Sequence, residues 1–156
     1  MLEKHNQYRA RHGAVALMWN GTLAEAATAL AQQLCETHAV TTKRSTVAYG
    51  ESVAVGKETD ARIVDRWYTE ASGQPYDFAN PAPPSATRFT QIVWKGTRQM
   101  GCAVASVDMN TGKPCQVAGP KGVAKPSVVQ VCEYFPAGNT GDVTEWQLNV
   151  AAATQP

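Results

Sequence analysis

Helical patterns fill the first half of the chain and strand patterns fill the second half, and this order restricts the fold more than any other feature. Apolar residues recur at helical spacing over residues 23–35, behind a Thr22-Leu-Ala-Glu25 capping box, which predicts a helix that begins at Thr22. Two further helices are predicted, one over residues 2–12 and one that begins near Asp60.

Runs rich in β-branched and aromatic residues predict three strands, over residues 89–94, 100–107 and 127–135. Residues 49–56 are apolar and bracketed by glycines, which is compatible with either a strand or an irregular segment. The connection over residues 108–126 is too long for a tight hairpin, and we expect an exposed, mobile loop there. Helices followed by strands predict an α+β fold in which helices pack on an antiparallel sheet.

Size and charge exclude several classes of protein. The 156 residues fit one domain, which we expect to span residues 1–156. The net charge is +1, and no cluster of lysines or arginines is dense enough to follow a phosphate backbone, so nucleic acid is not an expected partner. No apolar run reaches the roughly 18–20 residues that a membrane span needs.

The cysteines indicate the cellular compartment. Their even number, without a CxxC pair or a zinc-ribbon pattern, favours two disulfides and therefore a secreted protein. The four are Cys35, Cys102, Cys115 and Cys132. Four cysteines allow three pairings, and the sequence spacing does not choose among them. Asn20-Gly-Thr22 matches the N-glycosylation acceptor pattern, but the pattern is short enough to arise by chance.

Two segments of the second half stand out as motifs. Residues 88–94 read Arg-Phe-Thr-Gln-Ile-Val-Trp and are followed by Gly101-Cys102, and residues 131–139 read Val-Cys-Glu-Tyr-Phe-Pro-Ala-Gly-Asn. With the blocks at residues 5–9, 49–51 and 67–70, they resemble the CAP superfamily in the family's own order. That superfamily includes cysteine-rich secretory proteins, venom allergens and plant pathogenesis-related proteins, and this chain resembles a fungal or plant pathogenesis-related member.

The resemblance implies a three-layer α-β-α sandwich around a central antiparallel sheet. It also implies a disulfide pairing, in which Cys102 bonds Cys132 across neighbouring strands and Cys35 bonds Cys115. The second bond would hold the long 108–126 connection at one point.

Members of this family usually carry two histidines and two glutamates in a central cleft, often linked to divalent cations. His38, Glu51 and Glu70 match three of these positions, and the fourth, a histidine in the family, is Arg88 here. A guanidinium has no lone pair to donate and keeps its positive charge, so it cannot replace a histidine ligand. We therefore predict no Zn²⁺ or Mg²⁺ at this site and no cofactor.

Arg88 is instead expected to replace the cation by pairing with Glu51, Glu70 or both, because a fixed positive charge relieves repulsion between nearby carboxylates. The alternative is that Arg88 points to solvent. His38 has a similar alternative, a hydrogen-bonded cleft histidine with no function.

Lipid binding is the predicted function. Relatives are linked to sterol and fatty-acid binding, and the sterol site is placed in the loop before the Phe-Thr-Gln motif. Here that loop spans residues 71–85, and aromatic rings on a proline-stiffened loop can cover an apolar ligand. The candidate residues are Tyr76, Phe78, Pro81, Pro83 and Pro84. Alternatively, the two aromatic residues only anchor the loop onto the sheet.

Two other classes of function remain as alternatives. A secreted module for defence or virulence would engage a partner protein through the lysine-containing 108–126 loop. Enzymatic activity is not expected, because Ser52 follows Glu51 but no base or orienting group accompanies it. We therefore expect a secreted, monomeric, non-catalytic protein that binds a sterol or a fatty acid.

Overall fold

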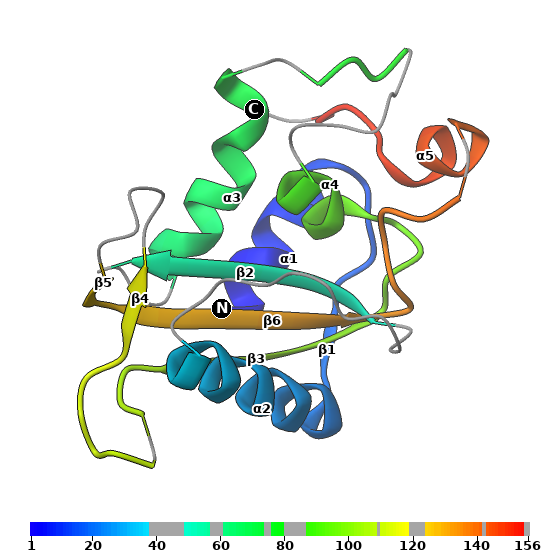
Figure 1. The fold of residues 1–156 in the computed structure, drawn as a ribbon. Coiled ribbons are helices and arrows are strands. Elements are labelled where there is room, and N and C mark those ends of the chain that lie inside the picture. The colour runs from blue at the N-terminus through cyan, green and yellow to red at the C-terminus, as the bar shows by residue number, and fades with distance from the viewer. Residues whose placement is uncertain are drawn as a thin grey trace.

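The computed structural model describes residues 1–37, 49–56, 61–73, 76–79, 87–108, 110–118, 124–141 and 143–154. The elements in these ranges, in order, are α1 (Leu2–Arg11), β1 (Met18–Trp19), α2 (Gly21–Thr37), β2 (Gly50–Gly56), α3 (Ala61–Gly73), α4 (Thr87–Val93), β3 (Gln99–Ala105), β4 (Gln116–Ala118), β5 (Ala124–Pro126), β6 (Val128–Phe135) and α5 (Val143–Asn149). A four-stranded sheet lies between two helical layers, with α2 on one side and α1, α3 and α4 on the other (Figure 1). This α+β sandwich confirms the predicted fold class.

The central strand of the sheet is β6. The strand order is β1-β3-β6-β2, and β6 pairs antiparallel with both β3 and β2, whereas the short β1 runs parallel to β3. The 49–56 segment, which the sequence left open, is therefore mostly the edge strand β2. No helix of the described ranges has both the length and the apolar character needed to cross a bilayer.

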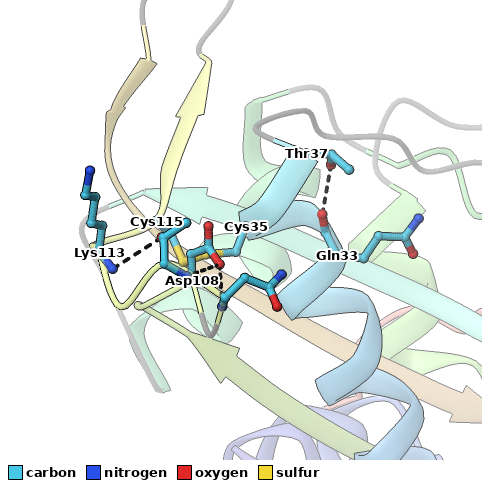
Figure 2. The surroundings of a disulfide bond; sticks show 8 residues. Gln33, Cys35, Thr37, Asp108, Lys113 and Cys115 are labelled. Atoms are coloured by element: carbon cyan, nitrogen blue, oxygen red, sulfur yellow. Dashed lines mark hydrogen bonds between the residues drawn. A yellow bond between two sulfur atoms is a disulfide. The ribbon is translucent and has the colours of Figure 1, made fainter.

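Both disulfides follow the pairing that the family resemblance implies. Cys102 and Cys132 are direct partners in the β3–β6 register and are bonded to each other. Cys35 of α2 bonds Cys115, 80 residues further along the chain. This disulfide ties the segment before β4 to α2 (Figure 2). The connection over residues 108–126 includes strands β4 and β5, which pair antiparallel, whereas the sequence predicted only a loop there.

Two apolar clusters cover the two faces of the sheet. On the upper face, Trp67 of α3 and Ile92 of α4 pack against Met100 and Tyr134 of the sheet. The lower cluster joins α2 to the strands through Leu30, Leu34, Val129 and Val131, among others. At Gly101 a β-carbon would lie 2.1 Å from the backbone nitrogen of Ala24, so only glycine lets α2 approach β3 this closely.

Arg9 is a fully buried cation that joins α1 to the end of α4. Its side chain donates hydrogen bonds to the carbonyl oxygens of Val15 (2.8 Å), Ile92 (2.8 Å), Trp94 (2.9 Å) and Thr97 (2.9 Å). Two of these acceptors lie at the carboxyl end of α4, where helix carbonyls lack intrahelical partners. Arg9 thus satisfies orphan carbonyls and fixes where α4 ends.

The two family motifs bond to each other in the folded chain. Gln91 of α4 accepts a hydrogen bond from the backbone N–H of Gly138 (3.0 Å), and the Thr90 hydroxyl donates to the side-chain oxygen of Asn139 (2.6 Å). Thr97 donates to the carbonyl of Pro136 (3.0 Å). Thr90 and Gln91 of the first motif thus bond Asn139 and Gly138 of the second, which explains why polar residues stand at these buried positions.

The predicted strand over residues 89–94 is wrong, because residues 87–93 form the helix α4. Five consecutive residues from Phe89 to Val93 are buried, since α4 is enclosed by other elements. A helix buried on nearly every side has no apolar–polar alternation, and a short apolar run cannot then be distinguished from a buried strand. Tertiary contacts, including those of Arg9, override the strand propensity of Ile92 and Val93.

Three smaller differences concern element ends and short elements. Helix α2 is capped by Asn20, whose side-chain oxygen accepts from the N–H groups of Thr22 (2.9 Å) and Leu23 (3.3 Å), so the predicted Thr22 capping box is displaced. Helix α3 continues to Gly73, into the predicted 71–85 loop. The sequence did not predict β1 or α5.

Replacing Arg9 with methionine should lower the free energy of unfolding by about 3–5 kcal/mol, because buried carbonyls would lose their donors. Arg11→Met is the matched control on the same helix, since Arg11 is exposed, and it should cost less than about 1 kcal/mol. Equilibrium unfolding in urea measures both values. Equal losses in the two variants would contradict the structural role of Arg9.

Candidate functional site

Glu70 and Arg88 form an ion pair where the end of α3 meets the start of α4. An Arg88 guanidinium nitrogen contacts a carboxylate oxygen of Glu70, and the guanidinium also donates to the backbone carbonyl of Val53 on β2 (3.3 Å). The Arg88 side chain is 44% exposed and that of Glu70 is 19% exposed. Arg88 therefore pairs with Glu70, and the Arg88 guanidinium links α3, α4 and β2.

Burial and charge act in opposite directions on Glu70. Burial raises the pKa of the Glu70 carboxyl above its ordinary value, and this is the largest effect. The positive charge of Arg88 and the backbone N–H groups of Arg88 and Phe89 lower the same pKa. Since burial dominates, Glu70 accepts a proton more readily than an exposed glutamate would.

A cavity of about 300 Å³ adjoins this ion pair. Its lining consists of Val53, Ala54, Val55, Ile63, Arg66, Trp67, Glu70 and Arg88. Two guanidinium groups and one carboxylate supply the charged lining, and a divalent cation would face repulsion from both arginines. Within the described ranges, no group of three histidine, cysteine, aspartate or glutamate residues is placed to hold a metal. The residues around this cavity therefore do not fit a divalent cation.

Glu51 and His38 do not join the Glu70–Arg88 pair in the described structure. Glu51 lies directly opposite Glu133 in the β2–β6 register and is not among the residues that line the cavity. Strand alternation puts the Glu51 side chain on the same face of β2 as the side chains of Val53 and Val55, which pack against the cluster between the sheet and α2. His38 lies outside the described residues.

The other two histidines bond elsewhere. The ring nitrogens of His5 lie 3.0 Å from the Met1 carbonyl oxygen and 2.9 Å from the Tyr134 hydroxyl, and His5 is fully buried. Those of His12 lie 2.6 Å from the Ala151 carbonyl oxygen and 2.9 Å from the Tyr68 hydroxyl. Neither is placed beside Glu70.

A second cavity, of about 270 Å³, lies on the other side of α3 and is lined mainly by aromatic residues. The lining residues are His12, Tyr68, Ala71, Ser72, Tyr76, Phe78, Phe89 and Ala153. The Tyr76 ring lies 4.9 Å from that of Phe78 and 6.0 Å from that of Phe89, between ring centroids. The Tyr76 ring therefore packs against Phe78 and against Phe89 of α4. Pro81, Pro83 and Pro84 lie outside the described residues.

The hydroxyl of Tyr76 is a buried polar atom inside this aromatic environment. Its oxygen has no hydrogen-bond partner among the described residues, and burial raises the pKa of the Tyr76 hydroxyl. A buried hydroxyl without a partner costs free energy that a bound polar group can recover. The sequence drew attention to Tyr76 as an aromatic residue, but the position of its hydroxyl emerges only from the fold.

Comparison with known proteins identifies the family. The model of the cysteine-rich secretory protein (CAP) family matches residues 2–134, and the chain belongs to this family. It is 34% identical over 140 residues to secreted protein RBT4 of Candida albicans, covering 89% of this chain and 34% of that protein. It is 30% identical over 155 residues to human Golgi-associated plant pathogenesis-related protein 1, covering 96% and 89%.

Other matches extend the picture. Protein PRY2 of Saccharomyces cerevisiae is 40% identical over 109 residues, covering 68% of this chain and 31% of that protein. The chain thus spans about a third of the length of RBT4 and PRY2.

Among solved structures, NaASP2 with Zn²⁺ has a TM-score of 0.64 at 18% identity, covering 99% of this chain and 84% of that one. A hookworm platelet inhibitor has a TM-score of 0.62 at 20% identity, covering 97% and 74%. At these identities the structures support the fold alone.

Zinc should not bind stoichiometrically beside Arg88, because the guanidinium repels the cation and donates no lone pair. The measurement is calorimetric titration of Zn²⁺ into metal-stripped protein. A stoichiometric heat that is lost in Glu51→Ala or Glu70→Gln would contradict this expectation.

Acid should destabilise the protein through His5, whose pKa burial lowers from 6.5 to about 4. At pH values between these two pKa values, His5 binds a proton in the unfolded chain but not in the folded chain. The free energy of unfolding therefore falls as the pH decreases. From pH 7 to pH 5 the contribution of His5 should be about 2 kcal/mol. Urea unfolding of the wild type and His5→Gln at both pH values measures it, and identical pH dependence in the two would contradict it.

Proposed function

We propose that this chain is a secreted, non-catalytic CAP protein that binds part of a sterol or a fatty acid in the aromatic cavity. The observation that carries the proposal is the lining of this cavity, in which Tyr68, Tyr76, Phe78 and Phe89 surround about 270 Å³. Ligand cavities are typically apolar, with a few polar groups that orient the ligand. The volume is at the small end for such sites, so one ring system or chain segment would fit, rather than a whole large lipid.

The buried Tyr76 hydroxyl supplies the polar group that such a site needs. A sterol hydroxyl or a fatty-acid carboxyl has the hydrogen-bonding capacity to pair with it, whereas a plain hydrocarbon does not. The three prolines at positions 81, 83 and 84 are proposed to complete the site, as the sequence suggested.

The non-catalytic part of the proposal is supported by the surroundings of Ser52. This serine is buried, and it lies on the strand position opposite Cys132, next to Tyr134 in the core. A nucleophile needs an accessible reacting atom and a base within hydrogen-bond reach. Because Ser52 is buried, its hydroxyl is not accessible to a substrate.

A second candidate function is engagement of a partner protein through the turn over residues 110–114. These five residues are exposed, and the turn is stiffened by Asp108, whose carboxylate accepts from the N–H groups of Asn110 (2.8 Å) and Thr111 (3.3 Å). The Cys35–Cys115 disulfide holds the end of the turn against α2, and Figure 2 shows Lys113 pointing away from the helix. A preorganised, exposed turn is a suitable recognition surface.

The lipid proposal predicts saturable binding of radiolabelled cholesterol or palmitate to the purified protein. The Tyr76→Ala/Phe78→Ala variant should bind about tenfold more weakly or worse, because two apolar rings leave the cavity. Phe135→Ala is the matched control, since Phe135 is an exposed aromatic residue at the end of β6.

Tyr76→Phe tests the hydroxyl separately and should weaken binding less than the double variant does. If neither lipid binds saturably, the lipid proposal is wrong and engagement of a partner protein becomes the favoured function. Wild-type affinity in the double variant would place any lipid site elsewhere.

A further inference from the structure

The wall of the aromatic cavity contains a hydrogen bond whose direction is fixed. The Nδ1 atom of His12 lies 2.6 Å from the carbonyl oxygen of Ala151, and a carbonyl only accepts, so Nδ1 carries the proton. Burial, the largest effect, lowers the pKa of His12 below its ordinary value of 6.5, so the ring is neutral at neutral pH. Its Nε2 atom is then an acceptor, and the Tyr68 hydroxyl donates to it across 2.9 Å.

This bond determines what the Tyr68 hydroxyl can offer to a ligand. Its one proton is donated to His12, its only hydrogen-bond partner in the described part of the chain, so its oxygen can now only accept. Both His12 and Tyr68 line the cavity. The buried Tyr76 hydroxyl lines it too, and because no described residue is its partner, it can still donate. The cavity thus presents one oxygen that only accepts and one hydroxyl that can donate.

We infer that this cavity selects the free hydroxyl of an uncharged apolar molecule over an ionised carboxylate, and that Tyr68, oriented by His12, is the residue that discriminates. The inference rests on the proposed binding of a lipid in this cavity and names the polar group that the site takes. An alcohol can donate to Tyr68 and accept from Tyr76, so both protein groups are satisfied. An ionised carboxylate has no proton to donate and would place a second acceptor against the Tyr68 oxygen.

The charges around the cavity favour the same choice. The described residues that line it include no lysine or arginine. From outside this lining, Arg11 and Lys95 help to lower the pKa of His12. Asp77 helps to raise the pKa of Tyr76, so charges of both signs surround the site without entering it. A buried carboxylate without a paired cation costs far more free energy than a hydrogen-bonded hydroxyl.

Three probes with the same short chain test the inference, namely 1-hexanol, hexyl methyl ether and hexanoate. The ether accepts but cannot donate, and it is more apolar than the alcohol, so weaker binding of the ether cannot come from a smaller hydrophobic effect. NMR at neutral pH on the methyl groups of Ala71 and Ala153, which line the cavity, measures binding. We expect saturable shifts with hexanol, about fivefold weaker binding of the ether and about tenfold or more weaker binding of hexanoate.

The outcomes separate this inference from the lipid proposal. Binding of the ether or of hexanoate that is as tight as that of hexanol would overturn the inference and leave the lipid proposal intact. No shift with any of the three probes would overturn both, because the cavity would then take no apolar ligand.

Two conservative variants test whether Tyr68 is the discriminating residue. Tyr68→Phe removes the acceptor, so hexanol and the ether should bind with equal affinity. Tyr76→Phe removes a donor that serves both probes, so it should weaken both about fivefold and keep the preference for hexanol. Tyr49→Phe is the matched control, because Tyr49 does not line the cavity, and it should change neither affinity.

A preference for hexanol that survives in Tyr68→Phe, or that is lost in Tyr76→Phe, would overturn the role of Tyr68. The comparison of hexanol with the ether in the wild type needs no variant. It therefore tests the selection of a hydroxyl even if Tyr68→Phe fails to fold.

Discussion

The hydrogen bonds of the buried Arg9 side chain hold together the parts of the molecule on which both cavities depend. Burying a guanidinium away from water costs free energy unless its N–H groups find acceptors. Here the carbonyl oxygens of four residues accept from it, namely Val15, Ile92, Trp94 and Thr97. These bonds set the end of α4 against α1. Thr97, whose carbonyl binds Arg9, in turn bonds Pro136, so the second family motif is positioned by the same interaction.

Helix α4 contributes a residue to each of the two cavities, the charged one and the aromatic one, which lie on different sides of α3. Arg88 and Phe89 are consecutive, and successive helical residues point about 100° apart. Arg88 therefore enters the charged cavity with Glu70, while Phe89 packs in the aromatic cavity with Tyr76. A single short helix, fixed by buried polar bonds at its far end, sets the walls of both.

Much of the architecture could be predicted from the sequence, and the failures have physical causes. The three long helices carry periodic apolar residues, and the disulfide partners follow from the family resemblance. Helix α4 was mistaken for a strand because its burial on nearly all sides removes the periodicity that distinguishes the two. The ion pair was half predicted: Arg88 was expected to pair with a carboxylate, but Glu51 and Glu70 were equivalent until the fold joined Arg88 to Glu70.

By itself, the sequence determined the family, the fold class, the four cysteines and the presence of an arginine at position 88, because these depend on residue identity and order. Only the tertiary structure decided that Glu51 sits opposite Glu133, away from the Glu70–Arg88 cavity, and that the Tyr76 hydroxyl is buried among aromatic rings. The reason is that strand register and helix packing bring together residues far apart in the chain, and local sequence does not record which residues of another element a side chain will meet.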